Sequence, residues 1–242
     1  MIYEQIHHII YNFSYATLFA LSWVYFVFLY FALAPVFNGI CELLAKKNLL
    51  HKIEEKEITQ KQLNFEKKHS FKSIFIFGTS TIPIIYLIRH GAIFIAPDTF
   101  FNIIFGLVIL NLWNEVHFFI IHSIMHLPFF MKRVHYIHHQ SKVPTVYSVY
   151  SFHWLEALLL STVPLTILLF FPLSFVAVAI YPLTSVLINY SGHCNYRFGN
   201  GKGNKWLLFG SAHNEHHFKN RKNYGFLLVI FDLIFTKFNK TK

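Results

Sequence analysis

The sequence has few charged residues and few cysteines. Only 13% of its 242 residues are Asp, Glu, Lys or Arg, whereas a soluble domain averages about 25%. A chain with so little charge has little polar surface with which to cover a core in water. Its two cysteines, Cys41 and Cys194, are too few for a disulfide framework. The composition therefore disfavours both a soluble globular domain and a disulfide-stabilised one.

Lysine and arginine are absent from the first 45 residues. A secretory signal peptide begins with a positively charged segment and ends at a small-residue cleavage site. Neither feature is evident here. We therefore expect the first apolar run to be kept as a membrane span.

Two common catalytic motifs are also missing. The sequence contains no glycine-rich loop of the Rossmann or P-loop type, which would cradle phosphate groups. The H-E-x-x-H motif of zinc-dependent hydrolases is absent as well, because the nearest approach, His213-Asn214-Glu215-His216, has the wrong spacing. Because the phosphate-cradling loop is missing, the chain is not expected to bind a nicotinamide cofactor itself. Because the H-E-x-x-H motif is missing, the sequence gives no support for a zinc-dependent hydrolase.

Long apolar runs are plentiful. Hydrophobic residues make up 55% of the chain, and about 20 apolar residues are enough to cross a bilayer. The last two runs are separated only by Phe171-Pro172-Leu173 and could form one tight hairpin. The sequence therefore predicts an all-α integral membrane bundle of four to five transmembrane helices. The runs are Tyr15–Phe37, Phe71–Ile88, Phe100–Ile121, Leu155–Phe171 and Leu173–Tyr190.

The basic residues indicate an orientation. Of the 21 Lys and Arg, 20 lie in Cys41–Lys72, in His126–His153 or after Tyr190. Five crossings would place these segments on the same side, and an excess of Lys and Arg in loops marks the cytoplasmic side. We expect a multi-pass membrane protein whose histidine-rich cap faces the cytoplasm. The net charge of +10 suits a face near anionic lipid, and nucleic acid is not an expected partner.

Histidines form the most informative pattern. Residues at i, i+3 and i+4 share a helix face, so we expect each cluster to direct its rings at one point. Neutral imidazole is the commonest protein ligand for transition metals, and eight histidines exceed the needs of one tetrahedral zinc. The pattern predicts two metal ions at one membrane boundary. The clusters are His122-x-x-x-His126, His135-x-x-His138-His139 and His213-x-x-His216-His217.

The order of these motifs resembles the fatty acid hydroxylase/sterol desaturase superfamily of integral membrane di-iron enzymes. The resemblance covers roughly residues 100–238, and the motifs occur in the family's order. The family begins with an acidic residue, H-R-x-x-H, H-x-x-H-H and an F-H-P-L-E-like element. It continues with a lone His with Asn two residues later, a second H-x-x-H-H, N-Y/F-G and W-D-R-L-F-G-T. Ser123, Trp154, Phe231 and Leu233 depart from that pattern, in ways that bear on subfamily and substrate. The matching elements begin at Glu115, His122, His135, Phe152, His193, His213, Asn223 and Phe231.

The resemblance implies two iron ions, molecular oxygen and an external electron donor. Family members hydroxylate, desaturate or oxidise lipids such as fatty acyl chains, sphingoid bases, sterols and alkyl ethers. We expect electrons to arrive from a cytochrome b5-like protein, a ferredoxin or a reductase that docks on the basic face. Zinc is expected to substitute for iron when the protein is overexpressed, because it binds such sites tightly.

Further polar residues are candidates for the site. Glu115 lies about two turns before His122, and we expect Glu115 or Glu156 to accept the second N–H of a ligand histidine; these are the predicted catalytic carboxylates. His117 is offset from the motif face and is expected to be a partnered membrane histidine. His153 and His193 are added as candidate ligands. The predicted metal ligands are His122, His126, His135, His138, His139, His153, His193, His213, His216 and His217.

These patterns predict a catalytic region in residues 100–242, preceded by membrane helices and a basic connector in residues 1–99. The predicted activity is oxygen-dependent hydroxylation or desaturation of a lipid. Two alternatives stay open: a non-catalytic metal-binding or metal-transport membrane protein, and a zinc-dependent membrane hydrolase. The hydrolase lacks its motif, and transport sites usually lie near the membrane midplane rather than at its boundary.

Overall fold

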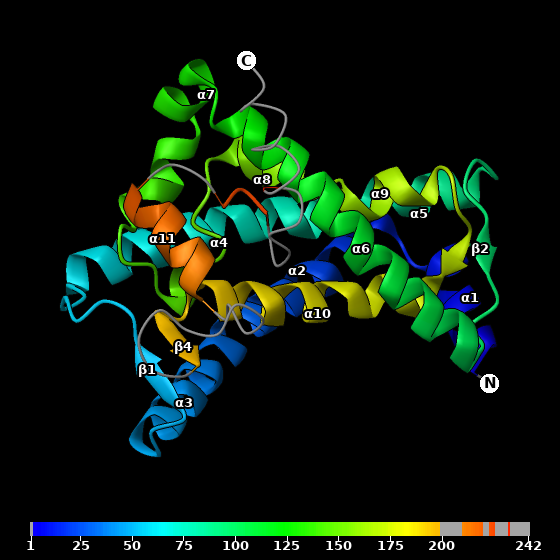
Figure 1. Cartoon of the computed structure of the whole chain (residues 1–242). Helices are drawn as coiled ribbons and strands as arrows, with labels where there is room; N and C mark the ends of the chain where they lie inside the picture. The colour runs from blue at the N-terminus through cyan, green and yellow to red at the C-terminus, as the bar shows by residue number, and fades with distance from the viewer. Residues whose placement is uncertain (1, 199–209, 220–222, 226–231, 233–242) are drawn as a thin grey trace.

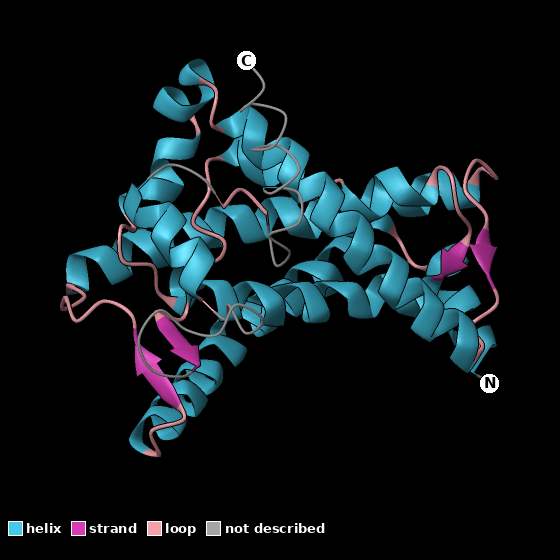
Figure 2. Cartoon of the chain, viewed as in Figure 1, coloured by secondary structure: helices cyan, strands magenta, loops and turns pink. Residues whose placement is uncertain are grey.

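The computed structural model describes residues 2–198, 210–219, 223–225 and 232, and it is mostly helical (Figures 1 and 2). The predicted all-α class is confirmed, since the strands of the described part form only two short pairs. The helices are α1 (Ile2–Asn12), α2 (Tyr15–Phe31), α3 (Leu33–Lys46), α4 (Gln60–Thr79), α5 (Thr81–Arg89), α6 (Phe100–Met125), α7 (Pro128–Arg133), η1 (His135–Gln140), η2 (Val146–Ser148), α8 (Trp154–Leu160), α9 (Val163–Leu168), α10 (Phe175–His193) and α11 (Ser211–Lys219). The strands are β1 (Leu50–Lys52), β2 (Ile95–Ala96), β3 (Leu173–Ser174) and β4 (Tyr196–Phe198).

Four helical segments of the described chain are long and apolar enough to cross a membrane. They confirm the predicted bundle of four to five spans. Large apolar side chains stay exposed along them, for example Phe28 at 55% and Leu112 at 53%, as expected of a surface that faces lipid rather than water. The segments are Tyr15–Lys46, Gln60–Arg89, Phe100–Met125 and Phe175–His193.

The predicted fourth span does not form one long helix. Residues Trp154–Leu168 form the two short helices α8 and α9, and Pro164 lies in the first turn of α9. Proline has no N–H and cannot continue the preceding helix. The segment nevertheless runs the length of the bundle, because β3 at its far end pairs with β2, Leu173 beside Ile95.

A hydroxyl side chain caps the start of each of four long helices. Ser14 precedes α2, Thr59 precedes α4, Thr99 precedes α6 and Ser174 precedes α10, and each accepts a backbone N–H three residues later. Such caps satisfy an N–H that has no partner within the helix. The sequence thus fixes where these helices begin.

Small residues let the helices pack closely. Helix α4 packs on α2, and α6 packs on α10. A Cβ atom at Gly78 would lie 3.1 Å from Trp23, and one at Gly106 would lie 2.7 Å from the Cβ atom of Ala177. Close approach at small residues is a common way to pack membrane helices. These contacts hold in place the helices that carry the histidines.

The bundle has two distinct ends (Figure 1). At one end β1 pairs antiparallel with β4, Leu50 beside Phe198, and Gln62 donates a hydrogen bond to the Val143 carbonyl. At the other end, Arg89 donates hydrogen bonds to the backbone of α1 and of the turn that follows it. The described parts of the three basic segments therefore meet at the first end, where the histidines also lie. Its predicted position on the cytoplasmic side stays a prediction.

Candidate metal centre

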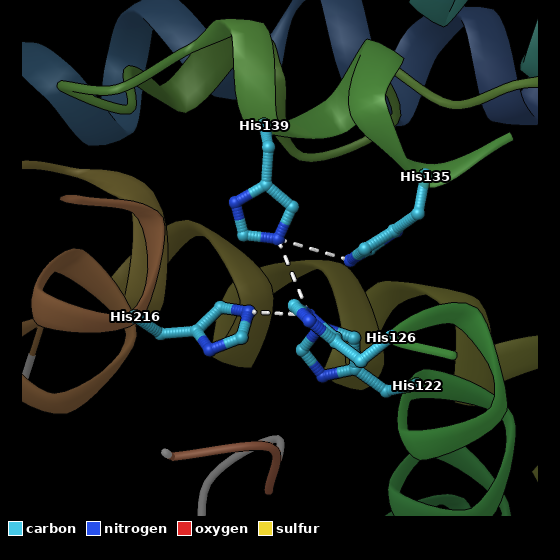
Figure 3. Close-up of side chains that lie close together, drawn as sticks. All are labelled: His122, His126, His135, His139 and His216. Atoms are coloured by element: carbon cyan, nitrogen blue, oxygen red, sulfur yellow. Dashed lines mark hydrogen bonds between the residues drawn. The ribbon is translucent and has the colours of Figure 1, made fainter. Parts of the chain in front are cut away.

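The first histidine group brings together side chains from three elements. Their ligand nitrogens all lie within 4.8 Å of one another (Figure 3). All are buried except the half-buried His126. Helix α6 and its C-cap contribute two of them, η1 two and α11 one, so residues far apart in the chain meet at one point. The group consists of His122, His126, His135, His139 and His216.

The second group is also buried and equally compact. It consists of His138, His193, His213 and His217, whose ligand nitrogens again lie within 4.8 Å of one another. His138 comes from η1, His193 from the last turn of α10, and the other two from α11. Nine of the ten predicted ligand positions therefore lie in two neighbouring groups, and each group is large enough for one metal ion.

Each H-x-x-H-H motif divides between the two groups. In α11, His213 and His217 belong to the second group and His216 to the first, whereas in η1 His138 is separated from its neighbour His139. The expectation that each cluster directs its rings at one point was therefore wrong for these two motifs, whereas His122 and His126 lie in one group. Adjacent residues point about 100–120° apart on a helix, so a consecutive histidine pair reaches two sites. The two motifs bridge the groups and fix the distance between them.

The spacing of ring nitrogens within the groups suits metal ligands. The Nε2 atoms of His126 and His216 are 3.1 Å apart, and those of His213 and His217 are 3.2 Å apart. Nitrogen ligands lie about 2.0–2.1 Å from a bound ion, so neighbouring ligands of one ion lie roughly 3 Å apart. The buried Nε2 atom of His122 has no hydrogen-bond partner in the described chain. A transition-metal ion fits this set of donors.

Outer partners determine which ring nitrogen of two histidines carries the proton. His122 Nδ1 lies 2.8 Å from the Tyr224 carbonyl, which can only accept. His193 Nδ1 lies 2.7 Å from the Ser148 hydroxyl, which already donates its proton to the Thr145 carbonyl. Both Nδ1 atoms must therefore donate, which leaves the Nε2 lone pairs free for a metal.

A carboxylate orients a third histidine. Glu156 is buried, and its Oε1 atom accepts the Nδ1 proton of His135 at 2.7 Å. This is the arrangement expected for a carboxylate partner of a ligand histidine. Glu115 is buried in α6 two turns before His122 and belongs to neither histidine group. The predicted carboxylate Glu156 therefore contacts a grouped histidine.

Asp232 holds the turn that contacts His122. Its two carboxylate oxygens accept the N–H groups of Tyr224 and Gly225 at 2.8 and 2.9 Å. The turn is thereby held with the Tyr224 carbonyl facing His122. Asn223, Tyr224, Gly225 and Asp232 are the described part of the predicted C-terminal motifs; Phe231 and residues 233–236 lie outside the described residues. Ser148 was not predicted, because a lone serine 45 residues from its histidine has no spacing signal.

Two other predicted histidines lie outside both groups. His153 is the N-cap of α8, and its Nδ1 atom accepts the Leu155 N–H at 3.2 Å. A capping role uses the lone pair that a metal would need, so the structure does not bring this candidate ligand into the site. His117 lies 3.0 Å from the Thr162 hydroxyl, in agreement with its expected role as a partnered membrane histidine.

Burial keeps at least five of the grouped histidines neutral. Desolvation, and then the neighbouring imidazoles, lower the pKa of His126 to about 2 and those of His138, His139, His213 and His217 below their usual range. The neutral ring is the form that binds metals. These histidines are therefore available as ligands at neutral pH.

An apolar cavity lies inside the bundle, and two of its wall residues pack against grouped histidines. It has a volume of about 540 Å³ and is lined by residues of α1, α2, α4, α5, α6, α8, α9 and α10. Phe118 on its wall packs against His122, and Phe152 packs against His138, each with ring centres 4.8 Å apart. Phe175 and Asn189 both line it and are fourteen residues apart on α10, so it extends for roughly 21 Å along that helix. The cavity is therefore separated from each group by one phenylalanine of its wall, and it is long enough for a lipid chain.

The family model described as fatty acid hydroxylase matches residues 107–237. The match covers more than half of the chain and includes all nine grouped histidines. No solved structure matches the chain.

Proposed function

Because the chain belongs to the fatty acid hydroxylase family, we propose that it is a membrane-bound di-iron oxygenase that hydroxylates or desaturates a lipid. The observation that carries this proposal is the position of the cavity. Its wall contacts one histidine of each group, through Phe118 and Phe152. An alkyl chain in the cavity would end beside the metal ligands.

Nine histidines would hold the metal, five at one ion and four at the other. Bound iron with molecular oxygen supplies the one-electron chemistry that an unactivated C–H bond requires and that amino-acid side chains cannot provide. The protein's part is to fix the ligands. Glu156, Ser148 and the Tyr224 carbonyl orient three rings, and burial of the groups keeps water away from them.

The cavity wall binds and positions the substrate. Its lining is largely aliphatic and aromatic, and none of the described residues that line it is Asp, Glu, Lys, Arg or His. Burying alkyl surface there is favourable by about 25 cal/mol per Å². The apolar lining favours a lipid substrate whose uncharged part enters the cavity and whose reacting carbon lies at the histidine end.

Electrons would come from a separate protein. The sequence has no phosphate-cradling loop for a nicotinamide, whereas the histidine end carries Lys and Arg on the β1–β4 pair, including Lys52 and Arg197. An acidic carrier such as a cytochrome b5-like protein or a ferredoxin would be attracted to such a face. We propose that the electron-donor protein binds at this end of the bundle because this end lies nearest to the histidines.

The site's position argues against the alternatives. Transport sites usually lie near the membrane midplane between helices, whereas both histidine groups lie where α6 and α10 end. A zinc hydrolase needs a glutamate base next to its ligands in an H-E-x-x-H helix, and that motif is absent from the sequence. Neither alternative accounts for an apolar cavity whose wall packs against both groups.

An oxygen-uptake assay tests the proposal. Iron-loaded protein in lipid nanodiscs is supplied with reductant and a membrane lipid extract, and oxygen consumption is recorded with the mass change of each lipid. We expect lipid-dependent uptake and a product that gains one oxygen atom or loses two hydrogens. Protein with two bound iron ions that consumes no oxygen with any lipid fraction would contradict the proposal. Zinc-loaded protein is the matched control and should be inactive.

A further inference from the structure

The hydroxyl of Tyr150 has no hydrogen-bond partner among the described residues, although the side chain is only 7% exposed. Tyr150 lines the cavity, and its ring is held by Tyr30 and Phe77 at centre-to-centre distances of 6.0 and 4.9 Å. The hydroxyl oxygen is not fully enclosed, and a ligand that covered it without accepting its hydrogen bond would cost free energy. The hydroxyl is fixed in place on the wall of a space that a ligand can fill.

Asn114 adds a second unused donor to the same wall. Its side-chain oxygen accepts the Tyr181 hydroxyl at 2.8 Å, and the residue is only 6% exposed. Its NH₂ group, however, makes no hydrogen bond within the described chain. The amide is thus held by its oxygen, and its two N–H donors are available to a ligand.

Other polar side chains on the wall already have partners. Ser22 and Thr81 bond to each other at 2.8 Å, and Ser80 donates to the Phe77 carbonyl at 2.6 Å. Asn189 donates to the Val149 carbonyl at 3.2 Å. Tyr150 and Asn114 are therefore two donors on this wall that a ligand can use.

Both unused groups lie toward the histidine end of the cavity. Tyr150 is two residues before Phe152, which packs against His138. Asn114 is one helical turn before Phe118, which packs against His122. A group bound by them would fix how far the substrate advances toward the metal ligands.

We propose that the enclosed part of the substrate carries an uncharged oxygen acceptor, such as a ketone, ester or hydroxyl oxygen, to which Tyr150 and Asn114 donate hydrogen bonds. A carboxylate would also accept these bonds, but a charge buried without a counter-ion costs far more than two hydrogen bonds return. The inference rests on the proposed function and narrows it, because a plain hydrocarbon segment would leave both donors unpaired.

Binding of matched probes tests this inference without requiring turnover. Radiolabelled octadecane, 2-octadecanone and 1-octadecanol are titrated against iron-loaded protein in nanodiscs. We expect both oxygenated probes to bind more tightly than octadecane, by about 2- to 13-fold for each hydrogen bond gained. Tyr150→Phe should reduce this preference by a factor in the same range and leave octadecane affinity unchanged.

Two further variants keep the test decisive. Ser80→Ala removes a cavity hydroxyl that is already bonded within the protein, so the preference should persist. Asn114→Leu is the second test variant and should reduce the preference as Tyr150→Phe does. Equal binding of all three probes to the wild type, or an unchanged preference in both test variants, would overturn the inference and leave the proposed function standing. Failure of the wild type to bind any probe would instead count against the proposed function.

Discussion

The position of a single proton decides whether a histidine can bind a metal. His122 and His193 each donate Nδ1–H to an oxygen that cannot donate back, so their Nε2 atoms face the groups as lone pairs. His135 is oriented in the same way by Glu156. The residues around the groups are thus as important to metal binding as the ligands themselves.

Removing one ligand from each group should show that there are two sites. His216→Ala removes a ligand of the five-histidine group, and His138→Ala removes one of the four-histidine group. We expect each variant to retain about one iron per chain and to lose activity, as measured by elemental analysis and oxygen uptake at equal expression. His51 and His69 lie outside both groups, so the control variants His51→Ala and His69→Ala should keep both ions. Full metal content in the two test variants would refute the assignment.

Glu156 should affect metal binding through His135. Glu156→Ala leaves the His135 N–H without its partner, and the loss of such a partner typically costs about 10–100-fold in metal affinity or activity. Glu156→Gln keeps an oxygen acceptor and should retain more of the metal. The measurement is competition against a chelator. An affinity in Glu156→Ala equal to that of the wild type would show that the hydrogen bond is dispensable.

The sequence predicted the ligand residues better than their grouping. Motif spacing identified eight of the nine grouped histidines, and the lone His193 was also selected. Spacing could not show that His138 and His139 serve different groups, since that depends on how η1 is turned against α11. Spacing also could not show that His153 lies outside both groups, because its role as an N-cap depends on where α8 begins.

At the scale of elements, helix α4 supports the histidine loop from outside the matched family region. Glu66 of α4 is fully buried, and its carboxylate accepts hydrogen bonds from Ser141 at 2.7 Å and from Thr145 at 2.5 Å. Ser141 directly follows η1, two residues after His139. Helix α4 therefore anchors the segment that supplies ligands to both groups.

Loosening this anchor should weaken the metal sites. Glu66→Ala removes the acceptor of the buried Ser141 hydroxyl and of the half-buried Thr145 hydroxyl. We expect metal retention to fall roughly tenfold, at the low end for an indirect partner. Glu66→Gln keeps the shape and one acceptor oxygen and should fall less. Asn64→Ala, on an exposed face of the same helix, is the control. Unchanged chelator sensitivity in Glu66→Ala would mean that η1 is held without α4.

Apolar run length predicted the long helices but not the break between α8 and α9. The four long spans were found because each has a continuous apolar run. Pro164 within the remaining run was a signal for an interruption. The contact between Glu66 and the histidine loop had no signal, because it joins residues about 75 positions apart through buried polar groups.

At the scale of the whole molecule, the two ends of the bundle should lie on opposite sides of the membrane. A reporter inserted near Lys56 or fused after Lys242 should read cytoplasmic, because basic loops mark that side. One inserted near Pro97, which directly follows β2 at the opposite end, should read outside. Reporters at Lys56 and Lys242 on opposite sides would show that the number of crossings is wrong.

The cavity is the feature of the whole molecule that was hardest to predict from the sequence. The abundance of Phe suggested an apolar slot, but its walls come from eight helices and depend on their packing. Through Phe118 and Phe152, its wall contacts one histidine of each group. We therefore expect a lipid to react at the end of this cavity that lies next to the histidines.

Isotope labelling tests whether a lipid is oxidised at this site. Iron-loaded, chemically reduced protein in nanodiscs with native lipid extract is exposed to ¹⁸O₂, and the lipids are analysed by mass spectrometry. We expect a lipid that gains one ¹⁸O atom or loses two hydrogens, in an amount that depends on bound iron and is abolished in His138→Ala. Protein that holds both iron ions and is reoxidised by oxygen, yet leaves every lipid unchanged, would contradict it.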